Sequence, residues 1–172
     1  MTSHASEKTQ PQTGFTLVEL IVVILLLSIL SAVAVSRFTS KQSFEVFALQ
    51  ELVVSVVRQV QVNRMQSNVD IDAVNNDNFV LAVASDCLGS VAACKDYQLD
   101  PNAPARSDRV TPPEYQFSIV GGDTSVSFDL LGNPLMTTLP VEILVTSSVS
   151  SEAGKVCINS QGHVTATTGA CL

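Results

Sequence analysis

Residues 14–35 read GFTLVELIVVILLLSILSAVAV, and this stretch decides the fold. From Leu20 to Val35 only two serines interrupt the apolar residues. At a rise of about 1.5 Å per residue, a helix that begins at Phe15 is long enough to cross a hydrocarbon core of about 30 Å. A single carboxylate, Glu19, lies near its start. Because an acid at membrane depth is costly, Glu19 is a candidate functional residue.

The helical pattern continues beyond this stretch. In residues 37–66, apolar side chains recur mostly three and four positions apart, with charged side chains between them. The apolar positions are Phe38, Phe44, Phe47, Ala48, Leu52, Val56 and Val60. Neither Pro nor Gly occurs between Phe15 and Leu88, and turn-forming residues first cluster in residues 67–78. We therefore expect one helix from about residue 16 to about residue 66.

Short runs of β-forming residues separated by turn signals follow this helix. The candidate strands are residues 78–84, 115–120, 125–131, 141–148, 155–159 and 163–167. Turns are expected at Gly121-Gly122, Gly132-Asn133 and Gln161-Gly162. Residues 96–114 contain four prolines and are predicted to form a long surface loop. The sequence predicts an α+β protein, in which a long N-terminal helix packs on a small antiparallel β-sheet.

The net charge of the chain limits which classes of partner are possible. The chain has 16 acidic and 9 basic side chains, a net charge of -7, and its cations are scattered along the sequence. Binding to nucleic acid uses clustered Lys and Arg that release counterions from the phosphates. No nucleic acid partner is expected.

Four cysteines, Cys87, Cys94, Cys157 and Cys171, lie beyond the apolar stretch. An even number in a domain outside the cytoplasm indicates two disulfides, for which three pairings are possible. We favour the sequence-local pairs, Cys87 with Cys94 and Cys157 with Cys171, because each closes a short loop that can bend as the bond requires. A zinc site is disfavoured because there is no C-x2-C motif and His163 is the only histidine near the cysteines.

Catalytic motifs are not found in the sequence. It has no G-x-S-x-G, no phosphate-binding glycine loop and no H-E-x-x-H, so we expect neither an enzyme nor a cofactor. Oxygen ligands for calcium occur at short spacing in residues 70–77, at Asp70, Asp72, Asn75 and Asp77. The glycine and the late glutamate of an EF-hand loop are absent, so no metal site is predicted, although a weak calcium site stays open.

The residues G-F-T-L-V-E-L, followed by an apolar helix and an amphipathic one, resemble the class III signal of type IV pilins and of the pseudopilins of type II secretion. The resemblance covers about residues 14–38 and implies the type IV pilin fold. It implies that prepilin peptidase cuts after Gly14 and that the new amino terminus, Phe15, is methylated. It also implies that Glu19 pairs with the amino terminus of a neighbouring subunit, which would compensate the buried carboxylate.

The domains expected from this resemblance are a cleaved leader (1–14), a transmembrane half of the helix (15–36), an amphipathic half (37–66) and a globular β domain (67–172). The chain would cross the bacterial inner membrane once, with a periplasmic C-terminal domain, before it reaches the pilus on the cell surface. Two features depart from the family. Many pilins have a proline where this chain has Ser36, and in the leader Lys8 is offset by Glu7, so the positive-inside rule gives little support to the orientation.

The C-terminal half narrows the resemblance further. FDLLGNPL (128–135) and KVCINSQGHVTA (155–166) are similar to the ending of pilin-like proteins of the FimT and pseudopilin H group. With the cysteine loop at the end, the chain most resembles a minor pilin of the mannose-sensitive haemagglutinin (MSHA) type. This implies a filament for adhesion, with other pilins, the peptidase and the assembly platform as partners. The alternatives are a minor pseudopilin of type II secretion and a DNA-binding competence pilin, for which Arg106 and Arg109 would be the residues to test.

Overall fold

The computed structural model describes residues 15–67 and 76–171, without the side chains of residues 33–43. The chain divides into two compact units, and the boundary falls between Ser40 and Lys41. Helix α1 (Leu17–Gln66) belongs to the first unit up to Ser40 and to the second unit from Lys41 onward. Its bounds agree closely with the expected helix. The predicted leader and domain boundaries stay predictions.

The apolar part of α1 has side chains described up to Ala32. Within the described parts of the chain, no helix is both long enough and apolar enough to cross a membrane. The membrane-spanning segment predicted at residues 15–36 is therefore not confirmed.

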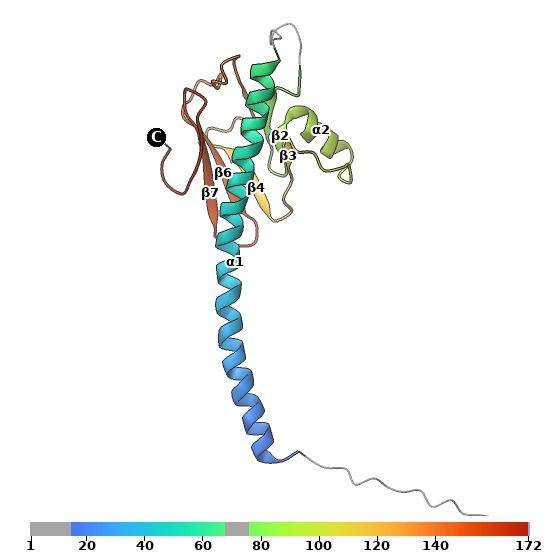
Figure 1. The fold of residues 1–172 in the computed structure, drawn as a ribbon, viewed down its shortest axis with the longest axis vertical. Coiled ribbons are helices and arrows are strands. Elements are labelled where there is room, and N and C mark those ends of the chain that lie inside the picture. The colour runs from blue at the N-terminus through green and yellow to red at the C-terminus, as the bar shows by residue number, and fades with distance from the viewer. Residues whose placement is uncertain (1–14, 68–75, 172) are drawn as a thin grey trace, which may run out of the picture. The chain divides into compact units, whose positions relative to one another are not determined.

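The second unit contains two antiparallel four-stranded sheets, some strands of which are labelled in Figure 1. The first has the strand order β3-β2-β1-β5 and the second has the order β4-β6-β7-β8. The first consists of β1 (Val80–Val83), β2 (Leu88–Ser90), β3 (Arg109–Val110) and β5 (Ser125–Ser127). The second consists of β4 (Tyr115–Ile119), β6 (Val141–Ser147), β7 (Ala153–Ile158) and β8 (Val164–Thr167). The α+β class is confirmed, with two sheets in place of the single sheet expected.

Strand β6 illustrates why these residues form a sheet. Its side chains alternate between buried and half-buried, as a strand with one covered face requires. At its centre, Ile143 pairs with Ile119 of β4 and with Val156 of β7, and all three side chains are buried. Cross-strand pairs of branched apolar residues stabilise a sheet and fix its register.

The predicted surface loop at residues 96–114 is wrong in part. Helix α2 (Val91–Leu99) extends into it, and β3 lies within it as an edge strand beside β2. Ser90 starts α2 as its N-cap, because its Oγ accepts a hydrogen bond from the N–H of Ala93 at 3.1 Å. Neither β2 nor β3 has enough residues to show a periodic pattern, which is why the sequence did not indicate them.

The C-terminal half of α1 lies along the strands (Figure 1) and supplies much of the core. Val53, Val57 and Val60 are fully buried there, in one cluster with residues of both sheets such as Val126 and Ile143. The buried α1 residues in this cluster are Leu49, Val53, Val54, Val56, Val57 and Val60.

The predicted apolar face of α1 is correct only towards its C-terminal end. Val56 and Val60 are buried, but Phe44, Phe47 and Leu52 are exposed. Valines occupy so many positions between residues 53 and 60 that the spacing allows more than one face to be the buried one. The sheets cover the side that carries the smaller, β-branched residues, which leaves the aromatic side chains outside.

A row of polar side chains on α1 is also buried against the sheets. Gln50, Gln61 and Arg64 are only 1%, 6% and 4% exposed. Their donors reach backbone carbonyl oxygens: Gln50 Nε2 donates to Lys155 O and Thr167 O, and Arg64 Nε donates to Phe128 O. These donors bond to main-chain oxygens of the strands and turns, so the helix is held by directed bonds as well as by apolar contact.

Replacing Gly154 with alanine tests this packing. A Cβ at Gly154 would lie 2.5 Å from Cδ and 2.7 Å from Cγ of Gln50, so the amide must leave its two acceptors. We expect Gly154→Ala to lower the free energy of unfolding by about 1–3 kcal/mol, measured by urea unfolding of the full chain in detergent. Gly169→Ala is the matched control, because its Cβ would meet only Thr167 Oγ1 at 3.7 Å. Equal stability of the two variants would contradict the proposed clamping by Gln50.

Candidate functional site

The N-terminal part of α1 exposes apolar side chains on all sides. Every large apolar residue from Phe15 to Leu30 is exposed, from 43% at Val23 to 82% at Phe15. A helix that is apolar all round is normally buried in a protein or a membrane, and contiguous exposed apolar surface marks an interaction site. The described chain does not bury the apolar side chains of this segment, so another molecule has to bury them.

The first turn of α1 is built around Thr16 and Glu19. The N–H of Glu19 donates to Thr16 Oγ1, and the N–H of Leu20 donates to Thr16 O, both at 3.2 Å. Thr16 is thus the N-cap, and the spacing Thr-x-x-Glu is that of a capping box. An acid in the first turn also interacts favourably with the helix dipole. Glu19 therefore has a local role in starting the helix, which the sequence analysis overlooked.

The Glu19 carboxylate has no ion-pair partner within the described part of the chain. The polar side chains deeper in the segment differ in this respect. Ser28 Oγ donates to Ile24 O and Ser31 Oγ donates to Leu27 O, both at 2.7 Å. These serines satisfy their hydroxyl groups within the helix, so they can enter an apolar environment at little cost. Glu19 is the charged group of the segment that needs an external partner.

The predicted cleavage site lies only partly within the described residues. Gly14 lies outside them, whereas Phe15 is the first described residue and is largely exposed. The roles predicted for Gly14, Phe15 and Glu19 therefore stay predictions.

Two turns that the sequence indicated separately come into contact. Gly132 and Gly162 both have positive φ, of 84° and 75°, and Gln61 Nε2 donates to the carbonyl oxygens of both, at 2.9 and 2.8 Å. In the first turn, Asp129 Oδ1 accepts from the backbone N–H groups of Leu131 and Asn133, both at 2.8 Å. The residues of FDLLGNPL thus form a rigid turn that α1 fixes to the closing hairpin.

Disulfides join Cys87 to Cys94 and Cys157 to Cys171, which are the sequence-local pairs. The first connects the start of β2 to α2. The second ties the segment after β8 back to β7. Their Cα atoms lie 5.8 and 5.6 Å apart, within the usual range for a disulfide. Both bonds therefore hold short surface segments against the sheets.

The two arginines that a DNA-binding pilin would use are already engaged. Arg106 donates to Asp96 and Asp108 at 2.8–3.0 Å. Arg109 donates to the carbonyl oxygens of Ala93 and Pro104, and its guanidinium lies 5.1 Å from the centre of the Tyr97 ring. The charge of Arg106 is thus neutralised by carboxylates, and donors of Arg109 are occupied within the chain, so both are less available to a phosphate. The geometry disfavours the DNA-binding alternative.

The calcium hypothesis is not supported by what the structure describes. Asp70, Asp72 and Asn75 lie outside the described residues, and Asp77 forms an ion pair with Lys95 at 2.6 Å. In the described ranges, no group of three or more His, Cys, Asp or Glu side chains could hold a metal ion.

Comparison with known proteins supports the resemblance at the N-terminus. Residues 10–35 match the prokaryotic N-terminal methylation motif. No curated protein matches the chain. Among solved structures, the chain is similar to the type IV minor pilin FimU of Pseudomonas aeruginosa, at 9% sequence identity and a TM-score of 0.47, over 76% of this chain and 92% of that one. This similarity is too low to assign the chain to a family. The evidence for a family is therefore the methylation motif.

The carboxylate network beside α2 predicts a pH dependence of stability. Asp108 accepts hydrogen bonds from Ser90 Oγ at 2.6 Å and from Arg106. Burial raises the pKa of Asp108, but the bonds from Arg106 and Ser90 outweigh burial and hold its pKa below the usual value. A carboxyl with a lowered pKa stabilises the fold above its unfolded pKa, and this stabilisation is lost as the pH falls through the folded pKa.

We therefore expect Asp108→Asn to be less stable than the natural chain by about 1–3 kcal/mol at pH 7. The difference should begin to narrow below about pH 4, where this carboxyl becomes neutral in the unfolded chain, and should be lost as the pH falls through the lower pKa of the folded chain. Urea unfolding from pH 7 to pH 3 measures it, with the exposed Asp123→Asn as control. A difference that stays constant with pH would exclude a charged Asp108 as the cause.

Proposed function

We propose that this chain is the precursor of a type IV pilus subunit, which is cut after Gly14 and assembled into a filament through the apolar half of α1. The observation that carries the proposal is the methylation motif at residues 10–35, joined to a helix whose large apolar residues from Phe15 to Leu30 are all exposed. Such a helix needs apolar surroundings both before and after assembly. A membrane supplies them before assembly, and the helices of neighbouring subunits supply them afterwards.

The proposed anchor rests on the sequence. The apolar run continues to Val35, beyond the last described side chain of the segment, Ala32. With one pass through the inner membrane, residues 41–171 would lie in the periplasm. The two disulfides agree with this placement, because disulfides form and persist in oxidising compartments.

Glu19 is proposed to select the position of each entering subunit. Its carboxylate needs an external cation, and the amino terminus created by a cut before Phe15 is the charge that an assembled neighbour would bring. A buried carboxylate becomes tolerable when an opposite charge meets it. A subunit inserted out of position would leave this carboxylate unpaired, so correct insertion is favoured.

The finer assignment is to a minor pilin of the MSHA type, in a filament used for adhesion. It is supported by the similarity of residues 128–135 and 155–166 to the ending of the FimT and pseudopilin H group, taken together with the cysteine loop at the end of the chain. A minor pseudopilin of type II secretion has the same N-terminal signal. The presence of the chain in sheared surface filaments, rather than only in the membrane, separates the two functions.

The mass of the chain recovered from membranes tests processing. Without reduction, we expect the mass of residues 15–172 plus one methyl group, less the four hydrogens lost in forming two disulfides. Intact-mass spectrometry measures this directly. After reduction the mass should rise by four hydrogens. A chain that retains residues 1–14 would contradict the pilin function and leave an anchored protein of another kind.

The exchange Glu19→Gln tests assembly. The variant keeps the size and the helix of the natural chain but loses the charge, so it should be processed normally. Removing one partner of a buried ion pair costs about 3–5 kcal/mol, which corresponds to a decrease of about a hundredfold or more in incorporation into filaments. Quantitative mass spectrometry of sheared filaments measures this, with Glu45→Gln as control. Normal incorporation of Glu19→Gln would rule out the pairing.

A further inference from the structure

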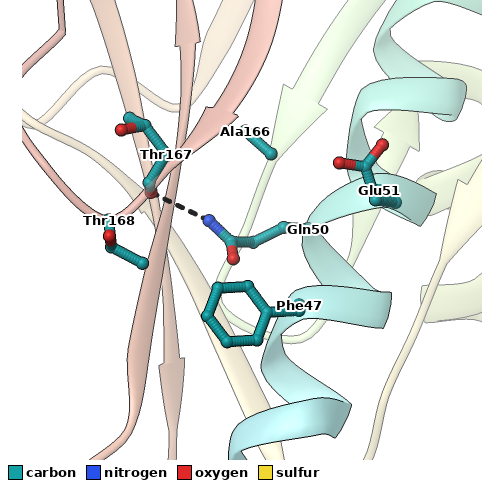
Figure 2. A pocket seen from close by; sticks show the side chains of 6 residues that line it. All are labelled: Phe47, Gln50, Glu51, Ala166, Thr167 and Thr168. Atoms are coloured by element: carbon teal, nitrogen blue, oxygen red, sulfur yellow. Dashed lines mark hydrogen bonds between the residues drawn. The ribbon is translucent and has the colours of Figure 1, made fainter.

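A pocket opens between α1 and the end of β8. Its walls are Phe47, Gln50 and Glu51 from the helix and Ala166, Thr167 and Thr168 from the strand and the residue after it (Figure 2). All six residues belong to the second unit. The pocket has a volume of about 330 Å³. This lies at the lower end of the range for binding sites, so it suits a single side chain better than a large ligand.

The Gln50 amide forms the polar part of this pocket and has a fixed orientation. Its Nε2 donates to Lys155 O and Thr167 O, both at 2.9 Å. Turning the amide over would place Oε1 against these two carbonyl oxygens, so Nε2 must face the strands. Oε1 is then directed away from them, on the side of the Phe47 ring (Figure 2).

Gln50 Oε1 is buried and has no hydrogen-bond partner among the described residues. Most buried side-chain acceptors in folded proteins have one, because an unsatisfied polar atom costs free energy. The atom therefore lacks a donor within the described chain, and the pocket that Gln50 lines offers a donor a route to it. Phe47 is 54% exposed, so its ring has room to turn and uncover Oε1.

The other walls attract a positive charge. The Glu51 carboxylate is exposed at the rim, and the face of the Phe47 ring carries the negative part of an aromatic quadrupole. The six described side chains that line the pocket include no cation. A donor with a positive charge and an apolar stem satisfies all of these groups together.

We propose that this pocket binds a lysine side chain of a neighbouring, different subunit. The apolar stem packs on Phe47 and Ala166, and the ammonium group donates to Gln50 Oε1 and to the Glu51 carboxylate. A compact ammonium with three donors suits acceptors that lie in different directions, whereas the planar fork of arginine suits a single carboxylate. The identity of the occupant as a pilus neighbour rests on the proposed function.

Charge favours a different subunit over a second copy. Among the residues with described side chains, the lysines Lys95 and Lys155 are both held in ion pairs, with Asp77 and Glu142. Each copy also has a net charge of -7, so like chains repel one another. A more basic partner supplies the free lysine and reduces this repulsion.

The pocket itself is tested on the full processed chain in detergent, by following the side-chain amide resonances of Gln50 by NMR. N-acetyl-lysine methylamide should shift these resonances to saturation, whereas N-acetyl-norleucine methylamide, which lacks the ammonium group, should not. Glu51→Gln should weaken the lysine compound by about two- to fivefold, and Glu45→Gln, outside the pocket, should leave it unchanged. Equal shifts with both compounds, or none with the lysine compound, would overturn the assignment.

The source of the lysine is tested in isolated filaments with a water-soluble carbodiimide, which joins a carboxylate to an amine in contact with it. We expect Glu51 joined to a lysine of another pilin, identified by mass spectrometry and lost in Glu51→Gln. Filaments that contain the chain without this link, or with a link to Lys41 of a second copy, would contradict the proposed partner. Binding of the lysine compound by a chain that never enters filaments would instead overturn the proposed function and leave the pocket assignment standing.

Discussion

Hydrogen bonds from α1 to backbone carbonyls are the interaction on which the second unit depends. Gln50 reaches both β7 and β8, and Gln61 reaches the two glycine turns. Apolar contact alone would leave the helix free to slide or rotate on a surface made largely of valine and isoleucine, because the hydrophobic effect has no direction. Four bonds between side-chain donors and fixed carbonyls allow only one position. The strands and turns that supply those carbonyls are in turn held in place by the helix.

This arrangement divides α1 into two segments with different chemistry. Up to Leu30 its large apolar side chains are all exposed, and the hydroxyl groups of Ser28 and Ser31 bond within the helix. Beyond Lys41 one face is buried against the sheets, and its polar side chains bond outside the helix. The first segment is therefore suited to surroundings that offer no hydrogen bonds, and the second is suited to a folded β domain. A single helix of this kind can serve as both anchor and scaffold, which is what the proposed function requires.

The sequence was sufficient for the features that repeat along the chain. The length of α1, the strand at residues 141–148 and the turns at Gly132 and Gly162 were all predicted from local patterns. Contacts between distant residues were not, and this is why the buried face of α1 was predicted wrongly. Valines fill several neighbouring positions, so only the sheets decide that Phe47 is exposed and Gln50 is buried. Similarly, β3 has two residues and exists because β2 offers it an edge, which no local pattern can indicate.

Glu19 and Gln50 share a physical property that gives assembly a direction. Each has a polar atom for which the described chain supplies no partner, a carboxylate in an apolar segment in one case and a buried amide oxygen in the other. In a membrane or in a protein interior, a group of this kind raises the free energy of the single chain, because it loses water without gaining a bond. If the partner belongs to another subunit, the deficit is removed only in the assembled state. Polar groups left unsatisfied in the monomer then favour the filament over the free chain, and they also restrict which neighbour fits.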